Sequence, residues 1–229
     1  DVERSRGLGD VYKRQNLNAA FIAQQLSRLG DVNESYSYWT FGDVFEELGV
    51  PFTPFHGGFG LVANGCITKP TFWTFAFYKK LEESEANCVY KDDNIVVLKR
   101  ANGDYLGVAW NIARKSTEQG KEKMLLEFTF PAEQEEYCFL TKTVDEETCN
   151  PLKVWHDMGE PANLSEEQTK LIRESSRPFV KTERKKQEDG NICVELPVNE
   201  NGVVYFELNA GKVNPDRGYD YDRVVSLKA

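Results

Sequence analysis

The sequence predicts an α/β segment over residues 16–84, followed by an all-β domain over residues 85–229. Two observations carry this prediction. The first segment holds two runs of apolar residues at helical spacing, separated by a strand-like run and a long loop rich in glycine and proline. The second holds short apolar runs bounded by Gly, Asn, Asp or Pro, at spacings typical of antiparallel sheets. We therefore expect an α/β unit joined to a β-sandwich.

In the first segment, residues 16–29 are expected to form an amphipathic helix, which Gly30 would end. Residues 36–41 are rich in aromatic and β-branched side chains, which favours a strand. After the loop, Thr68 as N-cap and Pro70 in the first turn predict a second helix that ends near residue 84.

In the second segment, seven strands are expected. They cover residues 88–92, 94–100, 105–112, 124–130, 136–144, 192–198 and 203–209. A helical insertion over residues 149–177 interrupts them, where Ser165 and Gln168 form a capping box for a helix that ends near residue 175. Residues 183–191 are expected to form a charged hairpin tip. Trp110 and Trp155 are expected to pack between sheet and helix.

Charge and cysteine content exclude several classes of partner. Twenty-eight basic against thirty-seven acidic residues give a net charge of -9, which argues against nucleic acid or an anionic membrane surface and favours a neutral ligand. No window approaches the roughly 20 consecutive apolar residues of a membrane span. The five cysteines form no CxxC motif and only two histidines are present, so we expect no metal and no cofactor. Buried free thiols, rather than disulfides, indicate a reducing, cytoplasmic location.

The first fifteen residues are set apart from the rest of the chain. They contain "SRGLGDVYKRQ", which resembles a translated sequencing-adapter artefact. We therefore expect residues 1–15 to be a non-native leader, with a native basic leader as the alternative. The artefact would make this chain the carboxy-terminal piece of a longer protein.

The stretch "SYWTFGDVFEELGVPFTPFHGGFGL" (residues 37–61) combines aromatic rings with two adjacent glutamates. A glycosidase needs two carboxylates facing each other across the scissile bond, about 5–9.5 Å apart. Adjacent residues diverge instead, so Glu46 and Glu47 are not such a pair. Aromatic faces beside charged acceptors suit a sugar ring and its hydroxyls. The alternatives are that Glu46 and Glu47 are solvated loop carboxylates and that Trp39 is a core residue.

Together with "NLNAAFIAQQL", "KPTFWTFAFYKKL", "GVAWNI" and "CNPLKVWHDMGEP", this stretch resembles glycoside hydrolase family 39, the β-xylosidase family, over most of residues 16–208. The resemblance implies a retaining glycosidase that releases xylose from the non-reducing ends of xylo-oligosaccharides. Its fold would be a (β/α)8 TIM barrel with an attached β-sandwich. The helix at residue 16, the strand at 36–41 and the helix from residue 68 would be barrel helix 7, strand 8 and helix 8.

The resemblance also assigns roles to residues. Both catalytic glutamates of the family would precede Asn16, so no catalytic residue is expected in this chain. Trp39 matches the family's sugar-stacking tryptophan, and Glu46 and Glu47 match carboxylates that line the xylose subsite. Phe55 and His56 lie in the same loop, where His56 would order the loop or contact sugar. The expected partner is a xylo-oligosaccharide or xyloside, with a homo-oligomeric parent left open.

Gly42 departs from the family pattern, which often has serine there, and this leaves Asp43 as the residue to cap a following helix. Two competing functions remain beside an inactive β-xylosidase piece. One is a non-catalytic carbohydrate-binding or scaffold β-sandwich module, and its sequence support is Trp110 and Trp155 in the strand-rich half. The other is a remnant in which residues 16–84 expose strand edges and helix faces and are unstable.

Overall fold

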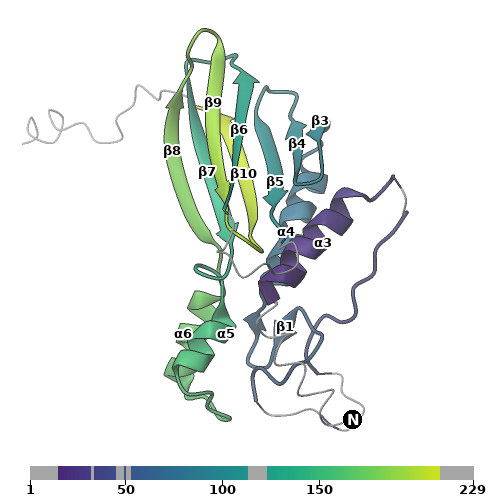
Figure 1. Cartoon of the computed structure of the whole chain (residues 1–229), viewed down its shortest axis with the longest axis vertical. Helices are drawn as coiled ribbons and strands as arrows, with labels where there is room; N and C mark the ends of the chain where they lie inside the picture. Colours follow the sequence, from purple (N-terminus) through teal and green to yellow (C-terminus); the bar gives the residue numbers. More distant parts are fainter. Residues whose placement is uncertain (1–14, 32–33, 45–48, 50–52, 113–122, 212–229) are drawn as a thin grey trace, which may run out of the picture.

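The computed structural model describes residues 15–31, 34–44, 49, 53–112 and 123–211. Figure 1 shows a layered β-structure at one end of the long axis, with helices α3 and α4 against it. At the other end lie the short helices α5 and α6 and the loop that carries strand β1.

Helices α3 (Gln15–Ser27) and α4 (Pro70–Glu83) pack against each other. The alanines of α3 are buried, and their small side chains allow α4 to donate hydrogen bonds to the α3 backbone. Thr74 Oγ1 bonds the carbonyl of Ala19 at 3.2 Å, and Tyr78 Oη that of Ala23 at 2.6 Å. Both predicted helices are therefore confirmed.

The predicted N-cap of α4 is wrong. Lys69 occupies the cap position and makes no side-chain capping bond. The hydroxyl of Thr68 is instead hydrogen-bonded to the hydroxyl of Ser176, 2.9 Å away. The side chain that the local pattern assigned to the start of the helix therefore bonds a residue 108 positions away in the sequence.

An antiparallel sheet of six strands forms the larger layer, in the order β3-β4-β5-β10-β7-β8. The strands are β3 (Asn87–Lys91), β4 (Ile95–Lys99), β5 (Tyr105–Trp110), β7 (Glu136–Val144), β8 (Phe179–Lys186) and β10 (Val203–Ala210). Strands β6 (Met124–Pro131) and β9 (Asn191–Val198) pair as the second layer. All seven predicted strands are present, in a β-sandwich.

Strand β8 was not predicted. Its sequence, "FVKTERKK", has only two large apolar residues, and both Phe179 and Val180 are exposed at the edge of the sheet. Charges on an edge strand discourage pairing with other chains, and they also remove the alternating apolar pattern. The predicted hairpin tip is a connection between layers, because the chain leaves β8 at Lys186 and enters β9 at Asn191.

Strand β10 separates two hydrophobic cores because its side chains alternate between the two faces of the sheet. Val204 and Phe206 belong to the core between the two sheets, whereas Val203 and Tyr205 face the helices. Phe77 of α4 stacks on the ring of Tyr205 with centroids 5.4 Å apart. Trp110 is fully buried in this second core, as predicted for a residue between sheet and helix.

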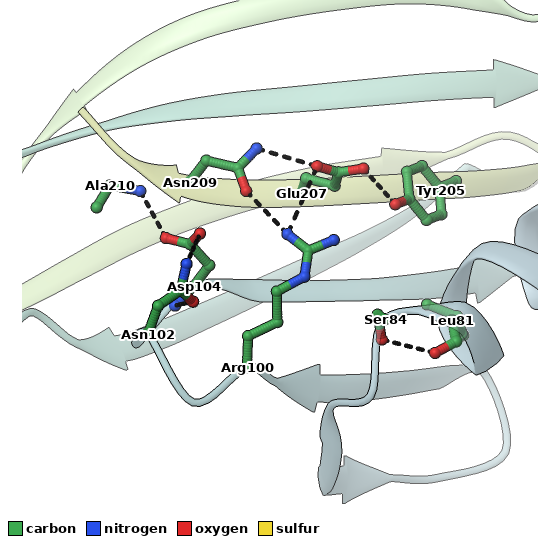
Figure 2. Close-up of polar contacts among 9 residues, drawn as sticks. All are labelled: Leu81, Ser84, Arg100, Asn102, Asp104, Tyr205, Glu207, Asn209 and Ala210. Carbon is green, nitrogen blue, oxygen red and sulfur yellow. Dashed lines mark hydrogen bonds and ion pairs between the residues drawn. The ribbon is translucent and has the colours of Figure 1, made fainter. Parts of the chain in front are cut away.

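A polar network around Glu207 lies on the helix-facing side of this sheet (Figure 2). The carboxylate of Glu207 accepts hydrogen bonds from Tyr205 Oη and Asn209 Nδ2, and Arg100 lies 3.9 Å away. Burial by itself would raise the pKa of Glu207, but these hydrogen bonds and the charge of Arg100 lower it below its usual value. The network therefore holds a carboxylate in its charged form at the end of β10.

The insertion contains helix α6 (Glu166–Ser175), as predicted, and a second short helix, α5 (Pro151–Asp157), which was not predicted separately. The capping box of Ser165 and Gln168 is confirmed. Trp155 was predicted to pack between sheet and helix, and this prediction is wrong. It lies in a third hydrophobic cluster with Phe55 and other loop residues, because α5 extends away from the sandwich.

Residues 36–41 form no strand, so that prediction is wrong. Their side chains do alternate between half-buried and exposed, as in a strand. A strand also needs a continuous hydrogen-bonded partner. Among the described residues, only the chain near Val62 supplies one, through a single parallel bridge to Gly42.

All five cysteines are free thiols, but only Cys149 is buried. The prediction of buried thiols is wrong for the other four, which lie exposed on strands and in the loop. Burial raises the pKa of the Cys149 thiol, which therefore stays protonated. No helix within the described ranges is both long and apolar enough to cross a membrane.

Candidate functional site

The extended segment of residues 36–41 presents two different faces. Tyr36 and Tyr38 lie against Phe75 of α4, with ring centroids 6.3 and 5.5 Å from it. Trp39 and Phe41 point the other way, and Trp39 is 68% exposed. The alternative of a core tryptophan is therefore wrong. The peptide bond between Trp39 and Thr40 is cis.

Backbone hydrogen bonds attach a loop to this segment. We call residues 53–68 the site loop; it contains the hairpin of β1 (Val62–Ala63) and β2 (Ile67–Thr68). Leu61 N donates to Thr40 O at 3.0 Å, and Val62 N to Phe41 O at 3.0 Å. The chain then turns back, and Asp43 N donates to Val62 O at 2.9 Å. The site loop thus runs beside the exposed tryptophan.

A buried ion pair lies under the site loop. Lys69 Nζ is 2.7 Å from Asp43 Oδ2, and the two side chains are only 9% and 0% exposed. Lys69 Nζ also donates to Gly58 O at 2.8 Å, and Gly60 N donates to Asp43 Oδ1 at 2.6 Å. Asp43 therefore organises the loop through these bonds. The helix that it was expected to cap would begin at residues outside the described ranges, so that prediction stays a prediction.

Burial lowers the pKa of Lys69, and the carboxylate of Asp43 opposes this shift. Two charges taken out of water are tolerated only with good geometry and further hydrogen bonds. Gly58 O and Gly60 N supply those bonds. The pair is therefore a structural clamp on residues 57–60.

Two glycines of the loop approach the clamp too closely to carry a side chain. A Cβ on Gly58 would lie 2.5 Å from Asp43 Cγ, and one on Gly60 only 2.4 Å from the backbone of Gly42. These close approaches explain why "HGGFG" needs glycine at both positions.

A groove of about 420 Å³ opens between the site loop and the first turns of α3. Its apolar wall consists of Leu17, Phe21, Phe55, Phe59 and Ile112. Its polar groups include Tyr38, Lys69 and the pair Asn18 and Thr71. Apolar walls with a few fixed polar groups are typical of small-molecule sites.

The polar floor of the groove is pre-organised. Asn18 Nδ2 is 3.0 Å from Tyr38 Oη and 3.0 Å from Thr71 Oγ1, and donates to both. Burial raises the pKa of Tyr38, against the hydrogen bond from Asn18, so the phenol stays protonated at neutral pH. Among the described residues that line the groove, none is acidic. These residues can hold a neutral ligand but supply no pair of carboxylates.

The structure brings only some of the predicted site residues together. Phe55 lines the groove, yet it is 3% exposed and packs on Trp155. His56 is half-buried in the same loop, and Trp39 is exposed outside the groove lining. Glu46 and Glu47 lie outside the described residues, so their predicted role stays a prediction.

Sequence reasoning missed the ion pair under the site loop and the polar part of the groove. Asp43 and Lys69 are 26 residues apart, and Asn18 and Thr71 are 53 apart. No local motif links residues at such separations. The one signal available was the alternation in residues 36–41, which places Tyr38 and Trp39 on opposite faces.

The model of the family "Glycosyl hydrolases family 39" matches residues 1–193, a range that includes the fifteen residues set apart above. A β-xylosidase of Geobacillus stearothermophilus is 37% identical over 192 residues, which are 84% of this chain and 37% of that protein. A β-xylosidase of Caldicellulosiruptor saccharolyticus is 31% identical over 209 residues, covering 88% of this chain and 42% of that protein.

The crystal structure of a GH39 enzyme from Xanthomonas axonopodis pv. citri shares the fold, with a TM-score of 0.72 at 24% identity. The match covers 86% of this chain and 41% of that one. The present chain therefore spans about two fifths of the length of the proteins it matches.

Proposed function

The chain belongs to glycosyl hydrolase family 39, and from that premise we propose that it is the carboxy-terminal part of a retaining β-xylosidase. The parent would release xylose from the non-reducing ends of xylo-oligosaccharides. This chain would carry one wall of the xylose subsite and neither catalytic glutamate. In the parent, α3 and α4 would be helices 7 and 8 of a (β/α)8 barrel. Residues 36–41 would take the place of strand 8, where neighbouring barrel strands would supply the pairing partners that the described residues lack.

The two-faced segment of residues 36–41 supports the barrel assignment. In a barrel, strand side chains alternate between the surrounding helices and the interior. Tyr36 and Tyr38 pack on α4, which would be the following barrel helix, and Trp39 and Phe41 would then face the interior. Residues at the carboxyl ends of barrel strands hold the substrate in such enzymes.

The exposed ring of Trp39 is the observation that carries the proposal. It is exposed on the face of residues 36–41 opposite to Tyr38, whose own side chain lines the groove. In the proposed subsite, Trp39 stacks on the sugar while Glu46 and Glu47 accept hydrogen bonds from its hydroxyls. Phe55 shapes the wall from behind, and His56 orders the loop.

A titration tests this subsite. We expect xylobiose to quench the tryptophan fluorescence of the chain in a saturable manner, and Trp39→Ala to weaken that binding at least about tenfold, because stacking supplies the apolar contact. The binding is measured by calorimetry for the variant, which lacks the reporting ring. Tyr90→Ala, which removes an exposed aromatic ring from β3, is the matched control and should bind normally. Equal affinity of both variants would contradict the role of Trp39.

An assay with an aryl xyloside tests the absence of catalytic groups. Loss of one key catalytic group commonly costs several orders of magnitude in rate, so we expect no turnover above background. Turnover that disappears in Glu46→Gln or Glu47→Gln, in a preparation free of contaminating enzyme, would show that these glutamates are catalytic.

The alternative of a carbohydrate-binding sandwich module loses its sequence support. Trp110 and Trp155 are both buried and therefore cannot stack on a sugar. Xylobiose binding that is unchanged by Trp39→Ala, Glu46→Gln and Glu47→Gln would place a sugar site on the sandwich and revive that alternative.

A further inference from the structure

We propose that helices α5 and α6 act as a brace that positions the site loop. The brace is defined by Trp155, Arg173 and Ser176, whose contacts join the insertion in the β-sandwich to residues 53–68. The idea that this loop serves a sugar site rests on the proposed function. The mechanical role of the brace does not.

An aromatic contact forms the centre of the brace. The rings of Phe55 and Trp155 have centroids 5.6 Å apart, and the two residues are 3% and 7% exposed. They belong to one hydrophobic cluster, to which the loop adds Ala63 and Ile67 and the helices add Leu152 and Ile172. Phe55 also lines the groove, so one side chain touches both the brace and the groove.

Two polar contacts fix the hairpin of the loop to α6. Arg173 Nε donates to Gly65 O at 2.7 Å, at the turn between β1 and β2. Gly65 adopts a φ of +80°, where a side chain would be strained. The hydroxyls of Thr68 and Ser176 share a hydrogen bond of 2.9 Å. The whole hairpin is thus tied to one helix.

The end of α6 is itself anchored. The carbonyl of Ser176 accepts from Trp73 Nε1 at 2.6 Å and from Cys149 Sγ at 3.1 Å. Trp73 belongs to α4, and Cys149 lies in the core between the six-stranded sheet and the helices. The brace therefore connects the loop to the most regular part of the molecule.

The site loop is consequently held from two sides. The Asp43–Lys69 pair fixes residues 57–60, and the brace fixes Phe55 and the hairpin at residues 62–68. Loss of the brace would leave the Asp43–Lys69 pair in place, but Phe55 would no longer be held in its position in the groove wall. Trp155 and Arg173 are positioning residues, since they act on the groove through the loop.

Hydrogen exchange of the whole chain tests the brace. Local opening of a loop can occur without unfolding of the core, and exchange resolves the two. We expect Trp155→Ala to accelerate exchange of the amides of residues 55–68 by at least about tenfold, with the amides of β5 and β10 unchanged. Trp155→Phe keeps an aromatic ring and should restore slow exchange. Leu171→Ala, at an exposed position on α6, is the control.

Two results would overturn the proposal. Loop exchange that stays slow in both Trp155→Ala and Arg173→Ala would show that the helices do not hold the loop. Xylobiose affinity that is unchanged while the loop exchanges faster would show that the brace does not position a sugar site. A wild-type chain that binds no xylobiose would refute the proposed function instead. The hydrogen-exchange rates alone would then decide whether α5 and α6 hold the site loop.

Discussion

The β-sandwich and the site loop of this chain depend on different kinds of interaction. In the sandwich, eight strands pair in antiparallel ladders, and six of them (β4, β5, β6, β7, β9 and β10) turn one face to a shared core. In the site loop, the backbone is mostly irregular and is held by a buried ion pair, a few hydrogen bonds and one aromatic contact. A regular sheet distributes its stability over many similar contacts, whereas the loop concentrates it in few.

The largest effect is expected at Lys69, because much of the stability of the site loop depends on its ion pair with Asp43. Lys69→Met leaves the carboxylate of Asp43 buried without its counter-charge, and breaking a buried pair in this way costs about 3–5 kcal/mol. Urea unfolding measures the loss, and exchange of the Leu61 and Val62 amides locates it. Because the cause lies under the loop, those amides should lose protection before the amides of β10 do.

Two variants sharpen that test. Lys79→Met removes an exposed lysine of the same helix and should change little, since exposed ion pairs contribute little to stability. The double variant Asp43→Leu/Lys69→Met should recover much of the lost stability, because no buried charge is left unpaired. A Lys69→Met chain as stable as the Lys79→Met chain would mean that the loop does not depend on the ion pair.

The sandwich should respond differently, by losing stability as one unit. Gly107 of β5 has no room for a side chain: a Cβ there would lie 2.3 Å from Val96 O and 2.6 Å from the ring of Phe206. Gly107→Ala should therefore cost about 1–3 kcal/mol, as overpacked cores do. Thermal unfolding should show a single transition at lower temperature.

Gly42→Ala is the control for that substitution, because its Cβ would have only ordinary contacts, the nearest at 3.8 Å. If Gly107→Ala loosened the site loop selectively and left the sandwich amides protected, the two regions would not be independent. The contrast between distributed and concentrated stability would then be wrong.

A smaller effect is expected from the helical insertion, which links the two regions. Ser165 caps α6 by accepting a hydrogen bond from Gln168 N, and loss of such a cap costs about 1 kcal/mol. Ser165→Ala should fray the first turn of α6, detected by faster exchange of the amides at its start. Ser37→Ala, at an exposed position outside any helix, should leave α6 unchanged. Equal exchange in both variants would contradict a stabilising cap.

The same contrast explains what the sequence could predict. Strands such as β7 and β9 alternate apolar and polar residues, and the capping box of α6 spans four residues, so local patterns reveal them. The clamp joins Asp43 to Lys69, and the brace joins Thr68 to Ser176, 108 residues away. Such pairs depend on how the chain folds back on itself, which no local pattern encodes.

The sequence alone did not show which aromatic residues are exposed and which are buried. Trp39 was expected to stack on a ligand and is exposed, as that role requires, whereas Phe55 in the site loop is a buried contact of the brace. Strand β8 was missed because its exposed edge carries charges in place of an apolar pattern.

The smallest expected effect concerns pH and the polar network of β10 (Figure 2). The folded chain lowers the pKa of Glu207 below its usual value of 4.5, so the folded state binds fewer protons there than the unfolded state. This contribution to stability is complete above pH 4.5 and is lost as the pH falls through the lower, folded pKa. Glu207→Gln, which cannot titrate, should therefore have a free energy of unfolding that depends less on pH below 4.5. Urea unfolding of both proteins between pH 6 and pH 3 measures the difference. Parallel pH profiles would mean that Tyr205 and Asn209 bind the neutral and charged carboxyl equally well, and that the network contributes packing alone to the end of the sheet.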